Sequence, residues 1–187
     1  MKDLMIDIET LGTNSNSVIL SIGAAFFDLK TGEVGSTFHT SINIESCLNV
    51  GLKASANTAL WWMQNEKALE NWAESKKQYL DKALYNFSNF IQGEELLDQD
   101  GKTIVWGNSN RFDLGLLENA YNAVEMEIPW NFRNERDVRT LVAFNPTIKY
   151  SAVKAAKESG VLLHDALEDC KLQIKYCSEI YNSLIKV

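Results

Sequence analysis

The chain has 187 residues, of which 45% are hydrophobic and only two are proline, so we expect one globular domain spanning residues 1–187. The opening residues lack the basic and apolar regions of a secretory signal, and no apolar run reaches the length of about 20 residues that a membrane helix needs, which predicts a cytoplasmic protein with no membrane partner. Three cysteines without CxxC spacing are typical of reduced thiols. The net charge of −7 argues against a passive nucleic-acid binder, although bound cations can reverse the sign of the field around an acidic site.

Three strands are predicted at the start of the chain. A short apolar run, residues 4–6, ends at Asp7, and residues 18–27 are rich in β-branched and aromatic side chains. A turn is expected at residues 28–32. Residues 34–42 have the pattern of a third strand, which would form an antiparallel hairpin with the second.

The middle of the chain changes to helical periodicity. Apolar residues recur every three or four positions over residues 55–91, and Gly93 together with the polar residues 99–101 is expected to end this section. Residues 103–106 have the composition of a buried strand. Helical spacing resumes over residues 112–124, so a strand followed by a helix is predicted.

Two more helices are predicted in the C-terminal part. A short helix covers residues 138–144, the last helix begins near Asp165, and Pro129 and Pro146 are expected in loops. This order of elements predicts an α/β fold in which helices cover a mixed sheet.

Asp7 and Glu9 flank one apolar residue at the end of the first predicted strand. Side chains alternate between the two faces of a strand, so both carboxylates would point to one face and Ile8 to the other. Two like charges this close favour a bound cation, and carboxylate oxygens are the ligands that Mg²⁺ and Mn²⁺ prefer.

Asp113 follows the predicted strand at residues 103–106 and begins the next helix. An acid at a helix start also interacts favourably with the helix dipole, which is the structural explanation of this residue. Asp113 becomes a candidate metal ligand only in the company of other acids.

The third acidic segment precedes and begins the last predicted helix. Asp165 and Glu168 have the spacing of a capping box, which assigns these two acids a structural role. Asp169 lies one turn into the helix and can return to the side of His164. An imidazole beside a metal site can accept a proton from an attacking water. His39 lies in a predicted strand whose pattern already explains it.

These residues resemble the motifs of the DEDD superfamily of 3′–5′ exonucleases, in the DEDDh subgroup with a histidine five positions before the last aspartate. Asp7 and Glu9 match the first motif, as DIETLG instead of the commoner DxETTG, and Asp113 matches the second. His164 and Asp169 match the third, HxxxxD. The resemblance implies a ribonuclease H-like fold, in which α-helices flank a mixed β-sheet.

Other segments resemble a bacterial and phage branch of this superfamily, related to a mycobacterial exoribonuclease and to phage exonuclease A, whose members act on RNA or on DNA. These segments are residues 21–24 (SIGA), 61–63 (WWM), 105–108 (VWGN), 112–113 (FD), 137–141 (DVRTL) and 164–169 (HDALED).

The resemblance implies hydrolysis assisted by two divalent metal ions, Mg²⁺ or Mn²⁺. Asp7 would bridge both ions, with Glu9, Asp113 and Asp169 completing the coordination, and His164 would act as the general base. The expected product is a nucleoside 5′-monophosphate, released from the 3′ end of a single-stranded nucleic acid.

Substrate contacts are expected beside the first two motifs. The family packs a terminal nucleotide against the residues that follow the first motif, here Thr10, Leu11 and Gly12. Asn108 and Phe112 would approach that nucleotide from the second motif.

Trp61 and Trp62 are candidates for stacking on a base, because aromatic faces bind single strands without sequence preference. Neighbouring helix positions point about 100° apart, so one of the two is expected in the core.

The most basic stretch of the chain contains Arg133, Arg136, Arg139 and Lys149. A solvated charged loop explains this stretch. Phosphate contact is the functional alternative, with Arg139 favoured because it lies in the family-like segment and a guanidinium matches phosphate geometry. Asp137 would either orient that arginine or pair within the loop.

Two other functions fit the sequence less well. One is a catalytically silent nucleic-acid-binding module, but silent relatives typically lose a ligand or the base, and this chain has all five residues. The other is a phosphodiesterase restricted to short oligonucleotides, which the sequence does not separate from an exonuclease. A homodimer is frequent among the relatives, but no heptad pattern in this chain demonstrates one.

Overall fold

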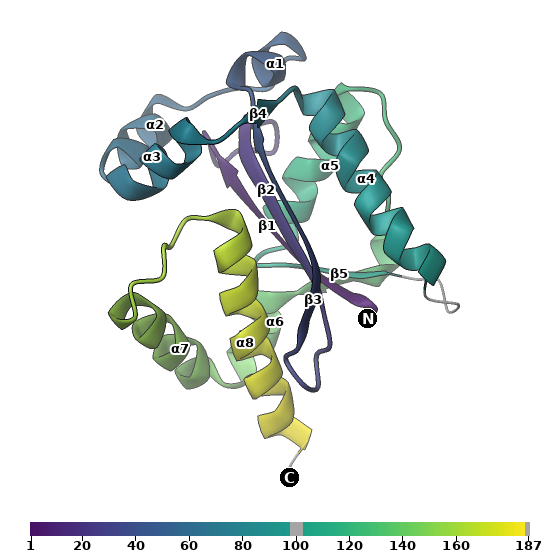
Figure 1. Cartoon of the computed structure of the whole chain (residues 1–187), viewed down its shortest axis with the longest axis vertical. Helices are drawn as coiled ribbons and strands as arrows, with labels where there is room; N and C mark the ends of the chain where they lie inside the picture. Colours follow the sequence, from purple (N-terminus) through teal and green to yellow (C-terminus); the bar gives the residue numbers. More distant parts are fainter. Residues whose placement is uncertain (98–102, 186–187) are drawn as a thin grey trace.

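The computed structural model describes residues 1–97 and 103–185, with residues 95–97 described by their backbone alone. In this part of the chain a six-stranded mixed sheet has the strand order β4-β3-β2-β1-β5-β6, and helices cover both of its faces (Figure 1). The strands are β1 (Asp3–Thr10), β2 (Ile19–Phe27), β3 (Val34–Ile42), β4 (Lys77–Gln78), β5 (Ile104–Gly107) and β6 (Glu135–Asp137). The helices are α1 (Ile44–Asn49), α2 (Ala56–Met63), α3 (Glu66–Glu74), α4 (Leu80–Leu97), α5 (Asp113–Ala123), α6 (Val138–Phe144), α7 (Pro146–Glu158) and α8 (Ala166–Ile185), with a short 3-10 turn at Phe132–Asn134.

The strands β1 and β2 form the centre of the sheet. β2 is buried at every position because its residues are apolar or small. β1 pairs with β2 in antiparallel orientation on one side and with β5 in parallel orientation on the other. β3 is antiparallel to β2, while β4 and β6 are short parallel strands at the two edges. The acids of β1 therefore lie in the middle of the sheet.

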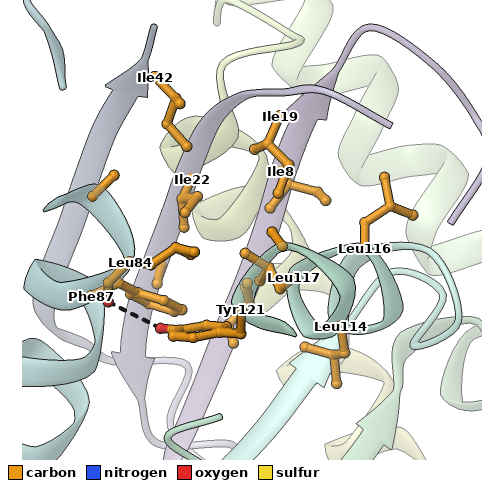
Figure 2. Close-up of a cluster of buried hydrophobic side chains, with 14 of the residues drawn as sticks. Ile8, Ile19, Ile22, Ile42, Leu84, Phe87, Leu114, Leu116, Leu117 and Tyr121 are labelled. Atoms are coloured by element: carbon orange, nitrogen blue, oxygen red, sulfur yellow. Dashed lines mark hydrogen bonds between the residues drawn. The ribbon is translucent and has the colours of Figure 1, made fainter. Parts of the chain in front are cut away.

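One face of the sheet carries the larger apolar core, beneath α4 and α5. Figure 2 shows Ile8 of β1 and Ile22 of β2 packed with Leu84 and Phe87 of α4 and with Tyr121 of α5. The hydroxyl of Tyr121 donates a hydrogen bond to the carbonyl oxygen of Leu84 at 3.1 Å. This core anchors one face of β1. The acidic side chain of Asp7 lies on the opposite face of the strand.

The opposite face is covered by α8, and a glycine makes the close approach possible. A Cβ atom on Gly23 of β2 would lie 2.3 Å from the carbonyl carbon of Ala166, so only glycine fits beneath the first turn of α8. One turn further on, the Sγ of Cys170 donates to the carbonyl oxygens of Met5 at 3.6 Å and of Gly23 at 3.4 Å. The start of α8 is thereby fixed against both central strands.

Most of the predicted elements are confirmed. The third strand and the helix at residues 138–144 have the predicted bounds, and the last helix begins one residue after Asp165. The first strand is longer than predicted because it pairs with β2 over its whole length, and residues 3–6 pair with β5 as well. All three cysteines are free and buried. Among the described helices, none has the length and apolar composition needed to cross a bilayer.

Other predictions are wrong. Gly93 does not end a helix but lies inside α4, where it is exposed and a Cβ would meet nothing within 4 Å. The predicted end at residues 99–101 lies outside the described residues. Pro146 is not in a loop but is the first residue of α7, a position that does not need its missing N–H. β4 interrupts the helical section predicted for residues 55–91, and α1, α7 and β6 had no predicted counterpart.

Gly23→Ala is expected to destabilise the protein, because the added Cβ would collide with the backbone of Ala166 and push α8 off the sheet. Overpacking of this kind typically costs about 1–3 kcal/mol, and thermal unfolding measures it. Gly93→Ala is the matched control, since open space surrounds that glycine, and it should leave stability unchanged or raise it by up to about 1 kcal/mol. Equal melting temperatures for the two variants would contradict the close packing described for α8.

Candidate active site

Four acids converge where β1 passes the first turns of α5 and α8. Asp7 and Glu9 come from β1, Asp113 is the first residue of α5, and Asp169 lies in the first turn of α8. Ligand atoms of Glu9, His164 and Asp169 lie within 4.8 Å of one another. Asp113 and Asp169 are close enough to Asp7 for their charges to raise its pKa. The structure thus brings together the five residues that match the sequence motifs.

The alternation of side chains along β1 separates the acids from the core. Ile8 belongs to the apolar core under α4 and α5, whereas Asp7 on the other face accepts a hydrogen bond from a side chain of α8, as period-two geometry predicts. Asp7 is 9% exposed and pairs across the sheet with Gly23. The glycine that admits α8 therefore lies next to the central acid.

Asp113 is placed at the start of α5 by the loop that follows β5. A Cβ on Gly107 would lie 3.2 Å from the Cβ of Asp113, so the glycine leaves room for this side chain. The helix-start position agrees with the dipole argument, but the N-cap is Phe112, which makes no side-chain cap hydrogen bond. The Oδ2 atom of Asp113 is buried and has no hydrogen-bond partner among the described residues. An unpaired buried carboxylate oxygen is costly unless a cation binds it.

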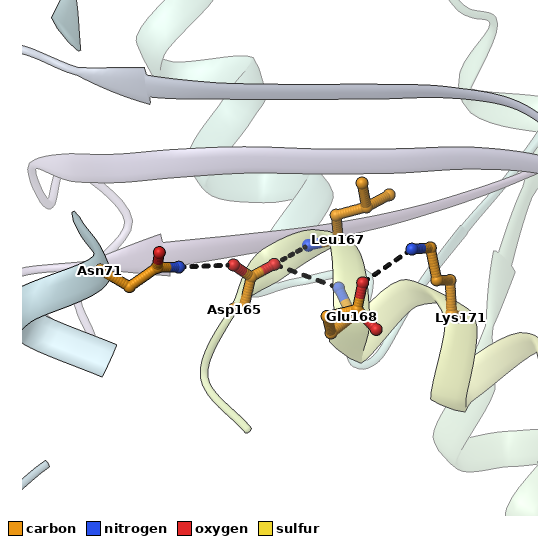
Figure 3. Close-up of polar contacts among 5 residues, drawn as sticks. All are labelled: Asn71, Asp165, Leu167, Glu168 and Lys171. Atoms are coloured by element: carbon orange, nitrogen blue, oxygen red, sulfur yellow. Dashed lines mark hydrogen bonds and ion pairs between the residues drawn. The ribbon is translucent and has the colours of Figure 1, made fainter. Parts of the chain in front are cut away.

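The start of α8 is capped by Asp165, as predicted. Its Oδ1 accepts hydrogen bonds from the backbone N–H groups of Leu167 at 3.1 Å and Glu168 at 3.2 Å, and its Oδ2 accepts one from the side chain of Asn71 at 2.9 Å (Figure 3). The reciprocal half of the predicted capping box is wrong, because the carboxylate of Glu168 pairs with Lys171 at 2.7 Å on the next turn. Asp165 and Glu168 thus have structural roles, and Asp169 is the one acid of this segment that is available as a metal ligand.

His164 lies in the loop before α8, with a left-handed backbone φ of +64°. Its backbone N–H donates to Oδ2 of Asp169 at 3.3 Å, and its imidazole packs edge-on against Trp61 with ring centroids 4.8 Å apart. Trp62 is 3% exposed, and its Nε1 donates to the carbonyl oxygen of Thr10 at 2.9 Å. One of the two tryptophans is in the core, as predicted, and it is Trp62. Trp61 is 40% exposed and supports the imidazole.

Burial raises the pKa of every acid in the cluster. For Asp7, burial and then the charges of the other three acids raise the pKa well above its usual range. Burial, followed by neighbouring carboxylates, raises the pKa of Glu9 to about 8. Burial also raises the pKa of Asp113 to about 7 and that of Asp169 to about 6. A divalent cation would stabilise the ionised form of such a cluster, so the donor set fits a metal centre.

A cavity of about 500 Å³ adjoins the acids. Three of the predicted substrate contacts, Thr10, Gly12 and Phe112, line it, and Glu9 and Trp61 form part of the same wall. One candidate metal ligand, Glu9, and the aromatic side chains of Trp61 and Phe112 are thus among the residues that line the cavity.

The other three predicted substrate contacts do not line this cavity. Leu11 is half-buried and packs against the apolar core. Asn108 lies in the loop after β5, where its carbonyl oxygen accepts a hydrogen bond from Nε of Arg139 at 3.0 Å. Arg139 is exposed, and its charge lies close enough to Asp113 to oppose the rise of that pKa. Both residues therefore lie near Asp113.

Asp137 connects that loop to α6. Its Oδ1 caps the helix by accepting from the backbone N–H of Thr140 at 2.8 Å, and its Oδ2 accepts from the backbone N–H of Asn110 at 2.9 Å. The carboxylate thus ties the loop after β5 to the start of α6, and no ion pair with the guanidinium of Arg139 is found among the described residues. Of the other basic residues in this stretch, Arg133 lies over the ring of Phe132.

Sequence reasoning missed several polar residues at the site. Ser55, Asn57 and Thr58 line the cavity from the start of α2, and Ser55 is the N-cap of that helix. A serine immediately before a helical pattern is a capping signal that predicts this position. Gln173 is 4% exposed and donates from Nε2 to Oδ1 of Asp7 at 2.7 Å. The sequence signal is a polar residue inside an apolar stripe, four residues after Asp169, but this signal does not name Asp7 as its partner.

Comparison with known proteins gives the family of the chain. The family model of the Rv2179c-like 3′–5′ exoribonuclease domain matches residues 2–181 of this chain. An exodeoxyribonuclease of Enterobacteria phage T4 is 24% identical over 206 residues, which cover 94% of this chain and 88% of the phage protein.

Solved structures share the fold. The nuclease domain of 3′hExo, a DEDDh family member bound to rAMP, has a TM-score of 0.66 and 12% identity over 97% of this chain and 92% of that chain. A zinc-bound complex of E. coli exonuclease I with single-stranded DNA has a TM-score of 0.63 and 16% identity over 98% of this chain, but only 42% of exonuclease I is covered. At these identities the likeness shows the ribonuclease H-like fold alone.

The family match extends over almost the whole chain, and the motif residues form one cluster in the structure. The chain belongs to the Rv2179c-like 3′–5′ exoribonuclease domain family, and hence to the 3′–5′ exonucleases.

Proposed function

We propose that this protein, acting as a single domain over residues 1–187, is a metal-dependent exonuclease that removes nucleoside 5′-monophosphates from the 3′ end of single-stranded RNA or DNA. The observation that carries the proposal is the convergence of four acids and one histidine beside a cavity of about 500 Å³. Support comes from the family match and from neighbours of the same fold that bind rAMP or single-stranded DNA.

Asp7, Glu9, Asp113 and Asp169 would hold two Mg²⁺ or Mn²⁺ ions. All four offer hard oxygen donors, and the unpaired Oδ2 of Asp113 is a buried acceptor that a cation would satisfy. Two divalent charges would also balance the four carboxylates. When bound, such ions activate a water and stabilise the charge that develops on the leaving 3′-oxygen.

His164 is proposed to accept the proton of the attacking water. Its ligand atom lies within 4.8 Å of those of Glu9 and Asp169, which places the imidazole at the edge of the proposed metal site. Packing against Trp61 and the hydrogen bond from its backbone to Asp169 restrict its position. A neutral imidazole is required, and burial favours the neutral form.

The terminal nucleotide is proposed to occupy the cavity between the first motif and α2. Phe112 and Trp61 line this cavity with aromatic surface, on which a base stacks regardless of its identity. Thr10 and Gly12 also line the cavity, and their backbone groups would lie close to the sugar. Leu11 and Asn108 would act from the margin, and Arg139 would contact a phosphate of the incoming strand.

Asp113→Asn is expected to reduce activity by on the order of a thousandfold, because loss of a metal ligand removes several kcal/mol of transition-state stabilisation. The assay follows shortening of 5′-labelled single-stranded RNA and DNA with Mg²⁺ or Mn²⁺, and chelation should stop it. Glu168→Gln is the control, since that acid pairs with Lys171 and should retain activity.

The same assay separates the competing functions. Ladders that shorten from the 3′ end support the exonuclease, and the two sugars are ranked by rate. Cleavage of short oligonucleotides alone would replace the proposal by the restricted phosphodiesterase. Binding of both polymers without metal-dependent cleavage would replace it by the silent module.

Activity is expected to be full above the ordinary histidine pKa of about 6.5 and to fall at more acidic pH. The reason is that burial, and then the charge of Lys157, lowers the pKa of His164, so the base stays neutral until the solution is more acidic than usual. Rates are measured with Mn²⁺ saturating at every pH. His164→Asn should lower the rate by about 10²–10⁴-fold and flatten this acidic limb. An unchanged limb in the variant would exclude His164 as the base.

Trp61→Ala is expected to raise KM, because stacking on an aromatic ring contributes about 1–3 kcal/mol per base, and to lower kcat, because the imidazole loses its support. Trp61→Phe should restore most of both parameters. Leu60→Ala is the control, as its side chain is 58% exposed on the same helix. A Trp61→Ala enzyme with wild-type KM would show that the base does not stack there.

A further inference from the structure

Gln173 is a polar residue in an apolar part of α8. It is 4% exposed, whereas Cys170, Ile174 and Cys177 around it are 0% exposed and pack in the core beneath the helix. Its Nε2 atom donates to Oδ1 of Asp7 at 2.7 Å. The amide of Gln173 therefore occupies a position where packing alone would favour an aliphatic side chain.

The hydrogen bond to Asp7 satisfies only half of this amide. The Oε1 atom of Gln173 is buried and has no hydrogen-bond partner among the described residues. A buried acceptor without a partner is unfavourable, while a methionine of similar length would fill the same space without that penalty. Stability of α8 does not explain the glutamine, which points to a role at Asp7.

The bond fixes the carboxylate at the centre of the acidic cluster. An ionised carboxylate has two oxygens with about four acceptor positions, and its terminal torsion is soft. Nε2 of Gln173 occupies one acceptor position of Oδ1 from the α8 side and holds the carboxylate plane of Asp7. The other positions are left for cations.

The uncharged amide suits this task. A lysine at position 173 would bring a positive charge that competes with a metal ion, and a glutamate would add a fifth carboxylate to the cluster. An asparagine would be one methylene too short to keep the 2.7 Å contact with Asp7. Glutamine supplies a donor of the right length without changing the charge.

Asp169 and Gln173 lie four residues apart on α8 and so share one face of the helix. The contact of the helix with Gly23 sets the depth of both side chains at once. One helix thereby supplies a proposed metal ligand and also orients a second ligand on β1.

We propose that Gln173 is a positioning residue that orients Asp7 for divalent metal binding. This inference rests on the proposed function, because it assumes that Asp7 is a metal ligand. Hydrogen-bonded partners behind metal ligands typically change metal affinity by about 10- to 100-fold when they are removed.

The test measures Mn²⁺ binding to the metal-stripped full chain without substrate, by the loss of the free Mn²⁺ signal in electron paramagnetic resonance. Gln173→Met and Gln173→Leu are expected to bind Mn²⁺ about 10- to 100-fold more weakly than the wild type, while melting at the same temperature or higher. The Mn²⁺ concentration that half-activates the nuclease should rise by a similar factor. A purely structural residue would lower the melting temperature and leave the metal affinity unchanged.

Ser178→Ala is the matched control on the same helix. Ser178 is 5% exposed and donates to the carbonyl oxygen of Lys30 at 3.4 Å, away from the acids. Its removal should leave Mn²⁺ affinity at the wild-type value. Mn²⁺ affinity within twofold of wild type in both apolar variants of Gln173 would overturn the positioning role and leave the metal site intact. Failure of the wild-type chain to bind Mn²⁺ would instead overturn the proposed function itself.

Discussion

The burial of four neighbouring carboxylates is the constraint on which the rest of this structure depends. Each acid resists ionisation because it is removed from water, and Asp7 and Glu9 also face the charges of other acids in the cluster. Without bound cations, a cluster of buried carboxylates of this kind would destabilise the fold. The proposed divalent cations would offset this cost, and the surrounding elements hold the carboxylates together.

The two faces of the sheet have different roles, because one packs in the apolar core and the other carries the acids of the candidate site. On one side of β1, Ile8 contributes to the apolar core beneath α4 and α5. On the other side, Asp7 faces α8 and the acids. Because successive residues of a strand point in opposite directions, the same strand is anchored by one face while the other face stays polar. The helix α8 can complete the site only because Gly23 lets it lie directly on the sheet.

The sequence predicted the parts of this site that depend on local pattern. Alternation placed Asp7 and Glu9 on one face, and the spacing of Asp165 from the last helix predicted its cap. The bonds that depend on tertiary packing were not predictable. Gln173 reads as one more residue of an amphipathic helix until its amide is seen against Asp7, and Gly93 reads as a helix end although the helix continues through it. Rules based on neighbouring residues in the sequence cannot predict such positions, because contacts between distant parts of the chain determine them.

Anomalous diffraction from crystals of this protein grown with Mn²⁺ and a nucleoside 5′-monophosphate tests the proposed two-metal site most directly. Two manganese peaks are expected about 3.5–4 Å apart, both in contact with the carboxylate of Asp7, with the nucleotide in the cavity beside Trp61 and Phe112. Manganese bound elsewhere, or an acidic cluster without any peak at saturating Mn²⁺, would contradict the proposed site.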